Sequence, residues 1–137
     1  MHTEKFLHFL EYEKRYSPHT IKSYSTDLDQ FRNFLYAEFN VFSISQIEFQ
    51  LIRAWVASLL NNDISARSVN RKITTLKTYF RFLLKEKLIL KSPMLKIISP
   101  KTSKRLPVFV EEIKMLELFN EIDFGEGFVA KRDRLIL

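Results

Sequence analysis

The sequence predicts an all-α protein whose main part is a small bundle of four helices. Only two of its 137 residues are Gly and four are Pro, whereas strand-rich folds use both freely in turns. Apolar residues recur at spacings of three and four along most of the chain, which is the period of an amphipathic helix. With 46% hydrophobic and 28% charged residues, the chain has the composition of a globular domain and not of a disordered one.

The first two helices are predicted from local signals. The first runs from about Thr3 to Arg15. Ser17 then reads as an N-cap, and Pro18 follows at the first helical position, where its missing N–H costs nothing. The second helix therefore extends from Pro18 to about Phe39. Its apolar stripe is Ile21, Tyr24, Leu28, Phe31 and Leu35.

A third helix is predicted over about 48–62, and the polar run 61–63 ends it. Ser65 then caps a fourth helix that reaches about Lys85. The apolar stripe of this fourth helix is Val69, Ile73, Leu76, Phe80 and Leu83.

Beyond residue 86 the helical pattern dissolves, because prolines at 93, 100 and 107 interrupt it. We expect a first domain over 1–98, a basic linker over 99–109 and the start of a further domain over 110–137. That last part contains a short helix at about 110–120 and another that begins near 129. The final helix stops in mid-pattern with three apolar residues at its end, which predicts a longer parent protein.

The chain has no cysteine, which excludes a disulfide framework, a thiolate zinc site and a cysteine nucleophile. It begins without the basic and apolar regions of a secretory signal. No apolar run approaches the roughly 20 residues that span a bilayer. We therefore expect a soluble cytoplasmic protein without a membrane partner.

The net charge of +6 is distributed very unevenly. Residues 1–64 carry a net charge of −2 and residues 106–137 a net charge of −3, while residues 65–105 carry +11 with Glu86 as their one acid. A contiguous block with this bias indicates that the protein binds a polyanion. A merely solvated helix usually mixes both signs, because like charges close together repel.

Two helices present polar faces away from their apolar stripes. On the fourth helix, cations and short hydroxyls lie opposite the stripe or on its flanks, and we expect no acid on this face: Arg67, Ser68, Arg71, Thr74, Thr75, Thr78 and Arg81. On the second helix the corresponding side chains are His19, Lys22, Ser23 and Thr26. Arg forks and short hydroxyls can contact phosphates and base edges in a major groove, which admits one α-helix.

Signals for catalysis are missing from the sequence. The three histidines lack metal-ligand spacing, and no Gly-rich phosphate loop occurs. Asp27 and Asp29 point to different sides of one helix and so form no carboxylate pair. We expect no catalytic residue, metal or cofactor in this chain.

Several segments occur in the order typical of one family. The first two segments are the run 17–24 followed by Leu28, Phe31 and Leu35, and the run 65–73 followed by Leu76 and 79–80. After them come Pro93, the 100–101 linker, 106–107 and 132–135. In this order they resemble the amino-terminal part of tyrosine site-specific recombinases of the Xer and phage-integrase type. The segment 91–94 departs from the family's usual Asn-Pro and small residue.

The resemblance implies a SAM-like core-binding domain that clamps one face of double-stranded DNA. The family's catalytic domain grips the other face and attacks a phosphodiester through a tyrosine, forming a 3′-phosphotyrosyl link. The resemblance places those catalytic residues beyond this sequence, so none is assigned here. It also implies partners: the carboxy-terminal catalytic domain and other protomers in a tetramer on DNA. The DNA contacts that the resemblance implies are His19, Thr20, Lys22, Ser23, Thr26, Arg67, Ser68, Arg71 and Thr75. Thr78 of the polar face and the neighbouring and linker cations complete the candidate set: Lys72, Lys101, Lys104 and Arg105.

Two other functions stay open from the residues alone. One is a stand-alone helical transcription regulator that uses 67–78 as a recognition helix. The other is a helical protein-interaction module without a nucleic-acid role.

Overall fold

The computed structural model describes residues 2–102, 114 and 125–136. It divides the chain into two compact units, Met1–Thr102 and Ser103–Leu137. The described residues of the first unit form helices joined by turns and irregular segments, without a strand, as the composition predicted. The predicted division at 98/99 and 109/110 stays a prediction.

The first unit contains four main helices: α1 (Thr3–His8), α2 (Pro18–Phe39), α3 (Phe49–Asn61) and α4 (Ala66–Lys85). A π-helical turn, η1 (Phe9–Glu13), continues α1, and a short 3-10 turn, η2 (Ile44–Gln46), lies between α2 and α3. The predicted first helix to Arg15 is therefore too long, since regular α-helix ends at His8 and the π-turn ends at Glu13. Arg15 adopts a left-handed backbone with φ of 52°.

The two longest helices begin as their caps predict. The Ser17 hydroxyl accepts from the Thr20 N–H at 3.3 Å, with Pro18 in the first turn of α2. The Ser65 hydroxyl accepts from the Ser68 N–H at 3.3 Å at the start of α4. Both bonds satisfy N–H groups that lack a partner within their own helix.

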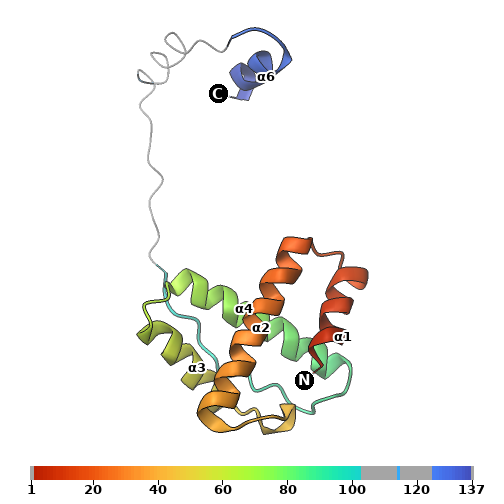
Figure 1. Cartoon of the computed structure of the whole chain (residues 1–137), viewed down its shortest axis with the longest axis vertical. Helices are drawn as coiled ribbons and strands as arrows, with labels where there is room; N and C mark the ends of the chain where they lie inside the picture. The colour runs from red at the N-terminus through yellow and green to blue at the C-terminus, as the bar shows by residue number, and fades with distance from the viewer. Residues whose placement is uncertain (1, 103–113, 115–124, 137) are drawn as a thin grey trace. The chain divides into compact units, whose positions relative to one another are not determined.

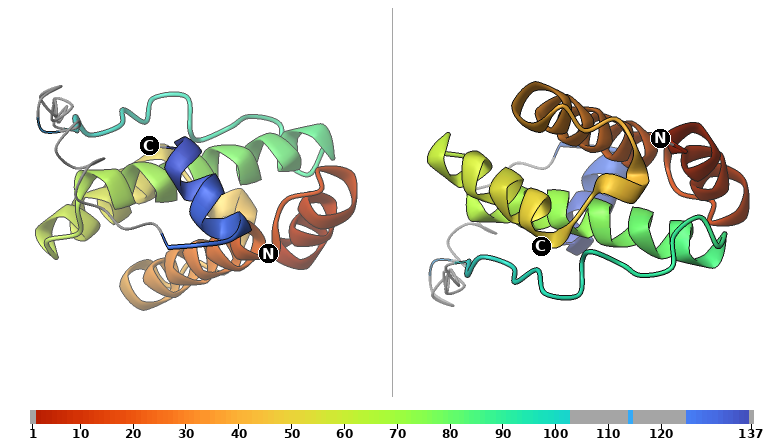
Figure 2. Two further views of the ribbon diagram at one scale, coloured as in Figure 1. Left: turned by 90° about the horizontal axis from the view of Figure 1, so that it is seen from above. Right: turned by 90° about the horizontal axis from the view of Figure 1, so that it is seen from below.

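The core lies where α2, α3 and α4 meet, and α1 closes one side of it. Helix α4 packs against α2 and α3, while α1 packs against α2. In every view α1 and α3 lie on opposite sides of the α2–α4 pair (Figure 1 and Figure 2). Phe31 and Trp55 join α2 to α3 with ring centroids 4.9 Å apart, and Phe6 meets Tyr79 edge-on at 5.2 Å. Helices α2 and α4, the two that were predicted to face DNA, therefore lie side by side on a shared core.

In the second unit the structure describes one helix, α6 (Phe128–Ile136), close to the predicted start near 129. Gly125 and Gly127 precede it with φ of 69° and 104°, which favours glycine at both positions. The helix predicted at 110–120 lies outside the described residues, apart from Lys114.

Tyr79 on α4 is almost completely buried. Burial raises the pKa of Tyr79 to about 12, and the nearby Thr3 side chain and His2 backbone oppose this rise. Neither neighbour forms a hydrogen bond of normal geometry with the Tyr79 hydroxyl, which therefore has no partner among the described residues. A buried hydroxyl without a partner loses its hydration without compensation.

This pKa predicts how the free energy of unfolding changes in alkaline solution. A folded-state pKa above the ordinary 10.0 contributes stability that is complete below pH 10 and is lost as pH rises towards about 12. We expect Tyr79→Phe to unfold in urea with a flatter dependence on pH above pH 10 than the wild type. We also expect its stability at neutral pH to be equal or higher, by up to about 1 kcal/mol, because the unpartnered hydroxyl is removed. Equal alkaline slopes, or a clear loss at neutral pH, would contradict this description of Tyr79.

Candidate nucleic-acid interface

The predicted residues of α2 lie in its first three turns. His19, Lys22 and Thr26 are exposed, while Thr20 and Ser23 are half-buried. The Thr26 hydroxyl donates to the Lys22 carbonyl at 2.9 Å. This leaves the lone pairs of the Thr26 oxygen free to accept a hydrogen bond from outside the helix.

The predicted residues of α4 divide into outward and inward groups. Arg67 is exposed and makes no hydrogen bond or ion pair with a described residue. Ser68 and Thr78 are half-buried, and the Thr78 hydroxyl donates to the Thr74 carbonyl at 3.0 Å. These side chains form part of the outer surface of α4.

Arg71 is not free, because a carboxylate from α2 holds it. Its Nη1 and Nη2 atoms lie 2.6 and 2.9 Å from the two carboxylate oxygens of Asp27, and Nη1 also donates to the Ser23 hydroxyl. The Arg71 side chain is still 45% exposed, whereas that of Asp27 is fully buried. The prediction that no acid meets this face is therefore wrong, since Asp27 reaches it from the neighbouring helix.

Two predicted contacts, Lys72 and Thr75, belong to the interior. Lys72 is 6% exposed and Thr75 is fully buried. The Lys72 Nζ atom lies 2.9 Å from Oδ1 of Asp27 and also donates to Gln30. The Thr75 hydroxyl donates to Oδ2 of Asp27 at 2.9 Å. Neither side chain is available to a ligand, so both leave the predicted DNA-binding set.

Together these groups form one polar junction between α2 and α4, in which the Asp27 carboxylate is buried and Gln30 and Arg71 reach the surface. We call it the Asp27 junction: Asp27, Gln30, Arg71, Lys72 and Thr75. Each carboxylate oxygen accepts two hydrogen bonds, so the buried charge is well satisfied. Two cations against one carboxylate leave the junction with a net charge of +1. The helical pattern of α4 alone could not assign Asp27 and Gln30 to this site, because both lie on α2.

A signal for this junction was present in the sequence. Asp27 lies between Tyr24 and Phe31 at helical spacing, on the inward side of α2. On α4, Lys72 and Thr75 share a second inward stripe with Tyr79 and Phe82, spaced three, four and three. An inward carboxylate on one helix and an inward lysine on the other predict a buried pair, because neither charge is found deeply buried alone.

The junction joins the two polar faces into one surface, because Arg71 starts on α4 and ends against Ser23 and Asp27 of α2. We call this surface the α2–α4 face. Its exposed and half-buried predicted members are His19, Thr20, Lys22, Ser23, Thr26, Arg67, Ser68, Arg71 and Thr78. Neither stretch that builds it contains an exposed acid, since 14–26 and 64–85 contain no Asp or Glu and Asp27 is buried.

The segment that leaves the first unit is tied to α4. The Asn70 amide donates to the Pro100 carbonyl at 2.9 Å, and Lys101 follows as an exposed residue. Asn70 thereby fixes where the predicted linker departs. Lys104 and Arg105, the other predicted linker contacts, lie outside the described residues.

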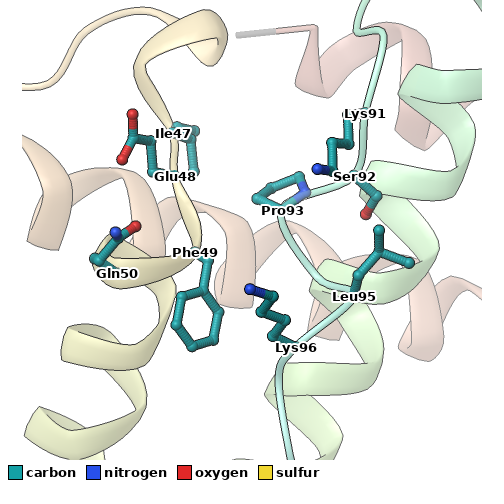
Figure 3. Close-up of a pocket in the computed structure, with 9 residues that line it drawn as sticks. All are labelled: Ile47, Glu48, Phe49, Gln50, Lys91, Ser92, Pro93, Leu95 and Lys96. Atoms are coloured by element: carbon teal, nitrogen blue, oxygen red, sulfur yellow. The ribbon is translucent and has the colours of Figure 1, made fainter.

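A separate open pocket of about 490 Å³ lies between the start of α3 and the segment 91–96 (Figure 3). Phe49 and Gln50 line one side, and Pro93, Leu95 and Lys96 line the other. The residues of the α2–α4 face do not line this pocket. Within the part of the chain that the structure describes, no three His, Cys, Asp or Glu side chains gather as a metal site, and no helix is long and apolar enough to cross a membrane.

Comparison with known proteins agrees with this architecture. Residues 3–87 match the family described as phage integrase, N-terminal SAM-like domain. Tyrosine recombinase XerC of Oceanobacillus iheyensis is 34% identical over the whole chain, and that of Staphylococcus aureus (strain MRSA252) is 36% identical over 98% of it. The chain spans 44% of the length of each of these relatives. No solved structure matches it significantly.

The first unit is thus a small all-helical domain with a cationic face on two adjoining helices. The chain belongs to the phage-integrase N-terminal SAM-like domain family and is homologous over its whole length to tyrosine recombinases, which confirms the resemblance in the sequence.

The Asp27 junction predicts a large difference between two aspartates on α2. Asp27→Asn leaves two cations without their counterion, one of them buried, and removing one partner of a buried pair costs about 3–5 kcal/mol. Asp29→Asn is the matched control, because Asp29 pairs with Arg32 at 2.9 Å with both side chains about half exposed. An exposed pair of this kind contributes less than about 1 kcal/mol. Urea unfolding of both variants measures the difference, and similar losses for the two would refute the buried junction.

Proposed function

We propose that this chain is the DNA-binding amino-terminal part of a tyrosine recombinase and clamps one face of the recombination-site duplex. The α2–α4 face is the observation that carries this proposal. It brings cations and hydroxyls from two helices onto one continuous surface that has no exposed acid of its own. Family membership supports the same function and favours it over a stand-alone regulator or a protein-interaction module.

The chemistry of the face suits a duplex. Lys22 and Arg67 are exposed cations, and Arg71 keeps almost half of its side chain exposed beside them. Cations of this kind bind phosphates and displace condensed counterions, which supplies sequence-independent affinity. The hydroxyls of Thr26 and Thr78 donate to their own helices and can accept from base amino groups.

For the parent protein we propose DNA strand breakage and rejoining through a tyrosine in a carboxy-terminal catalytic domain. The homology to tyrosine recombinases supports this, and the chain corresponds to less than half of their length. The further partners would be other recombinase protomers in a tetramer on paired sites. The place of action would be the cytoplasm, with the DNA.

The dependence of affinity on salt tests this function. If the face neutralises about four to six phosphates, log K falls with log[salt] at a slope near −4 to −5. Anisotropy titrations of a labelled mixed-sequence duplex with the 137-residue chain measure this slope. A slope near zero would reject DNA as the ligand.

Two single-arginine variants locate the contact. Arg67→Ala should make the slope shallower by about one phosphate equivalent, because no carboxylate among the described residues neutralises the Arg67 charge. Arg53→Ala is the matched control with the same change in charge, since Arg53 is exposed on α3 beside a different pocket. Equal effects of the two substitutions would show that net charge, and not the α2–α4 face, determines binding.

A further inference from the structure

The hydrogen bonds of Arg71 use only part of its guanidinium. The group has five N–H donors in a planar fork. The Nη1 atom donates to Asp27 and to Ser23, and Nη2 directs one N–H to Asp27. The carboxylate therefore occupies the end of the fork, between the two Nη atoms.

The other edge of the fork remains available. The Nε–H and the second N–H of Nη2 bond to no acceptor among the described residues, and the side chain is 45% exposed. These two donors lie side by side in one plane, the arrangement that binds two adjacent acceptors at once. Phosphate oxygens and the O6 and N7 atoms of guanine both offer such a pair.

The carboxylate that fixes this orientation is itself held firmly. Asp27 is fully buried and accepts from the Lys72 ammonium and the Thr75 hydroxyl at 2.9 Å each. It cannot follow Arg71 towards solvent without abandoning the buried ammonium of Lys72. The guanidinium is thus anchored at its end by a rigid partner, which lowers the entropy that a free arginine loses on binding.

We propose that Asp27 is a positioning residue for DNA binding: by holding the end of the Arg71 guanidinium, it presents the Nε/Nη2 edge as a two-donor fork for a phosphate or a guanine. This inference rests on the proposed function and adds to it a residue that touches no DNA. It also predicts that the affinity for DNA depends on the contact between Asp27 and Arg71 and not on Arg71 alone.

A double-mutant cycle on the 137-residue chain tests the proposal. The four proteins are the wild type, Asp27→Asn, Arg71→Gln and the double variant, titrated with the labelled mixed-sequence duplex. We expect Asp27→Asn to weaken binding about tenfold when Arg71 is present, the scale of one lost bidentate contact. In the Arg71→Gln background we expect it to change the affinity less than about twofold. A purely structural role would weaken binding equally in both backgrounds.

Folding is checked separately, because Asp27→Asn leaves the buried ammonium of Lys72 without its counterion. Far-UV circular dichroism shows whether Asp27→Asn is folded. If it is unfolded, the variant Asp27→Asn/Lys72→Met takes its place in the cycle, because it removes the buried cation together with its counterion. The single variant Lys72→Met then takes the place of the wild type. Equal effects in the two Arg71 backgrounds, or no effect of Asp27→Asn in either, would overturn the positioning role while Arg67→Ala still reports DNA binding. Absence of wild-type binding would overturn the proposed function and this inference with it.

A second duplex identifies the acceptor. Replacing every guanine by 7-deazaguanine removes N7 and leaves the phosphates unchanged. If Arg71 contacts guanine, the substituted duplex binds the wild type more weakly but binds Arg71→Gln as before. If Arg71 contacts phosphate, Arg71→Gln weakens the binding of both duplexes by the same factor. Either pattern supports the fork, and an Arg71→Lys variant that binds like the wild type contradicts it, because a lysine cannot supply two donors in one plane.

Discussion

The buried carboxylate of Asp27 is the constraint on which the rest of the polar architecture depends. A charge without water needs donors on both oxygens, and here α4 supplies all four of them. The apolar core holds α2 and α4 together, but the hydrophobic effect is non-directional. The Asp27 junction is directional, and so it fixes which turn of α2 lies beside which turn of α4.

This register has an electrostatic consequence for the surface above it. The first turns of α2 and the outer side of α4 carry cations without exposed acids between them, and like charges on neighbouring helices repel. Asp27 is buried beneath this surface and pairs with Arg71 and Lys72, so the junction keeps a net charge of +1 and adds no exposed acid. The two helices can therefore remain close while their outer sides stay positive, which is what a polyanion ligand requires.

Local chemistry allowed much of the fold to be predicted. Helix α2 begins and ends at the predicted residues, and α4 follows the predicted Ser65 cap, because caps act within a few residues of the chain. The π-turn at Phe9–Glu13 was missed, since no residue there marks a change from α to π geometry. The fold class follows from helical periodicity and from the scarcity of Gly and Pro.

The candidate site was predicted less completely, for a physical reason. The helical wheel of α4 places Thr75 on a flank of the polar face, and Lys72 was added to the candidates as a neighbouring cation. Their burial depends on Asp27, which is 45 and 48 residues away in sequence. A single-helix pattern contains no information about such a partner. The outward residues Lys22 and Arg67 needed no partner, and for them exposure followed from periodicity alone.

The most direct test of the account is an NMR titration of the isotope-labelled 137-residue chain with a mixed-sequence duplex, following the backbone amides and the arginine Nε–H signals. We expect the shift changes to concentrate at 19–26 and 67–78, to include the Arg71 Nε–H and to leave the α3 signals unchanged. Changes centred on α3 and 88–98 with an unmoved Arg71 Nε–H would contradict it, because the ligand would then bind away from the two helices that Asp27 joins.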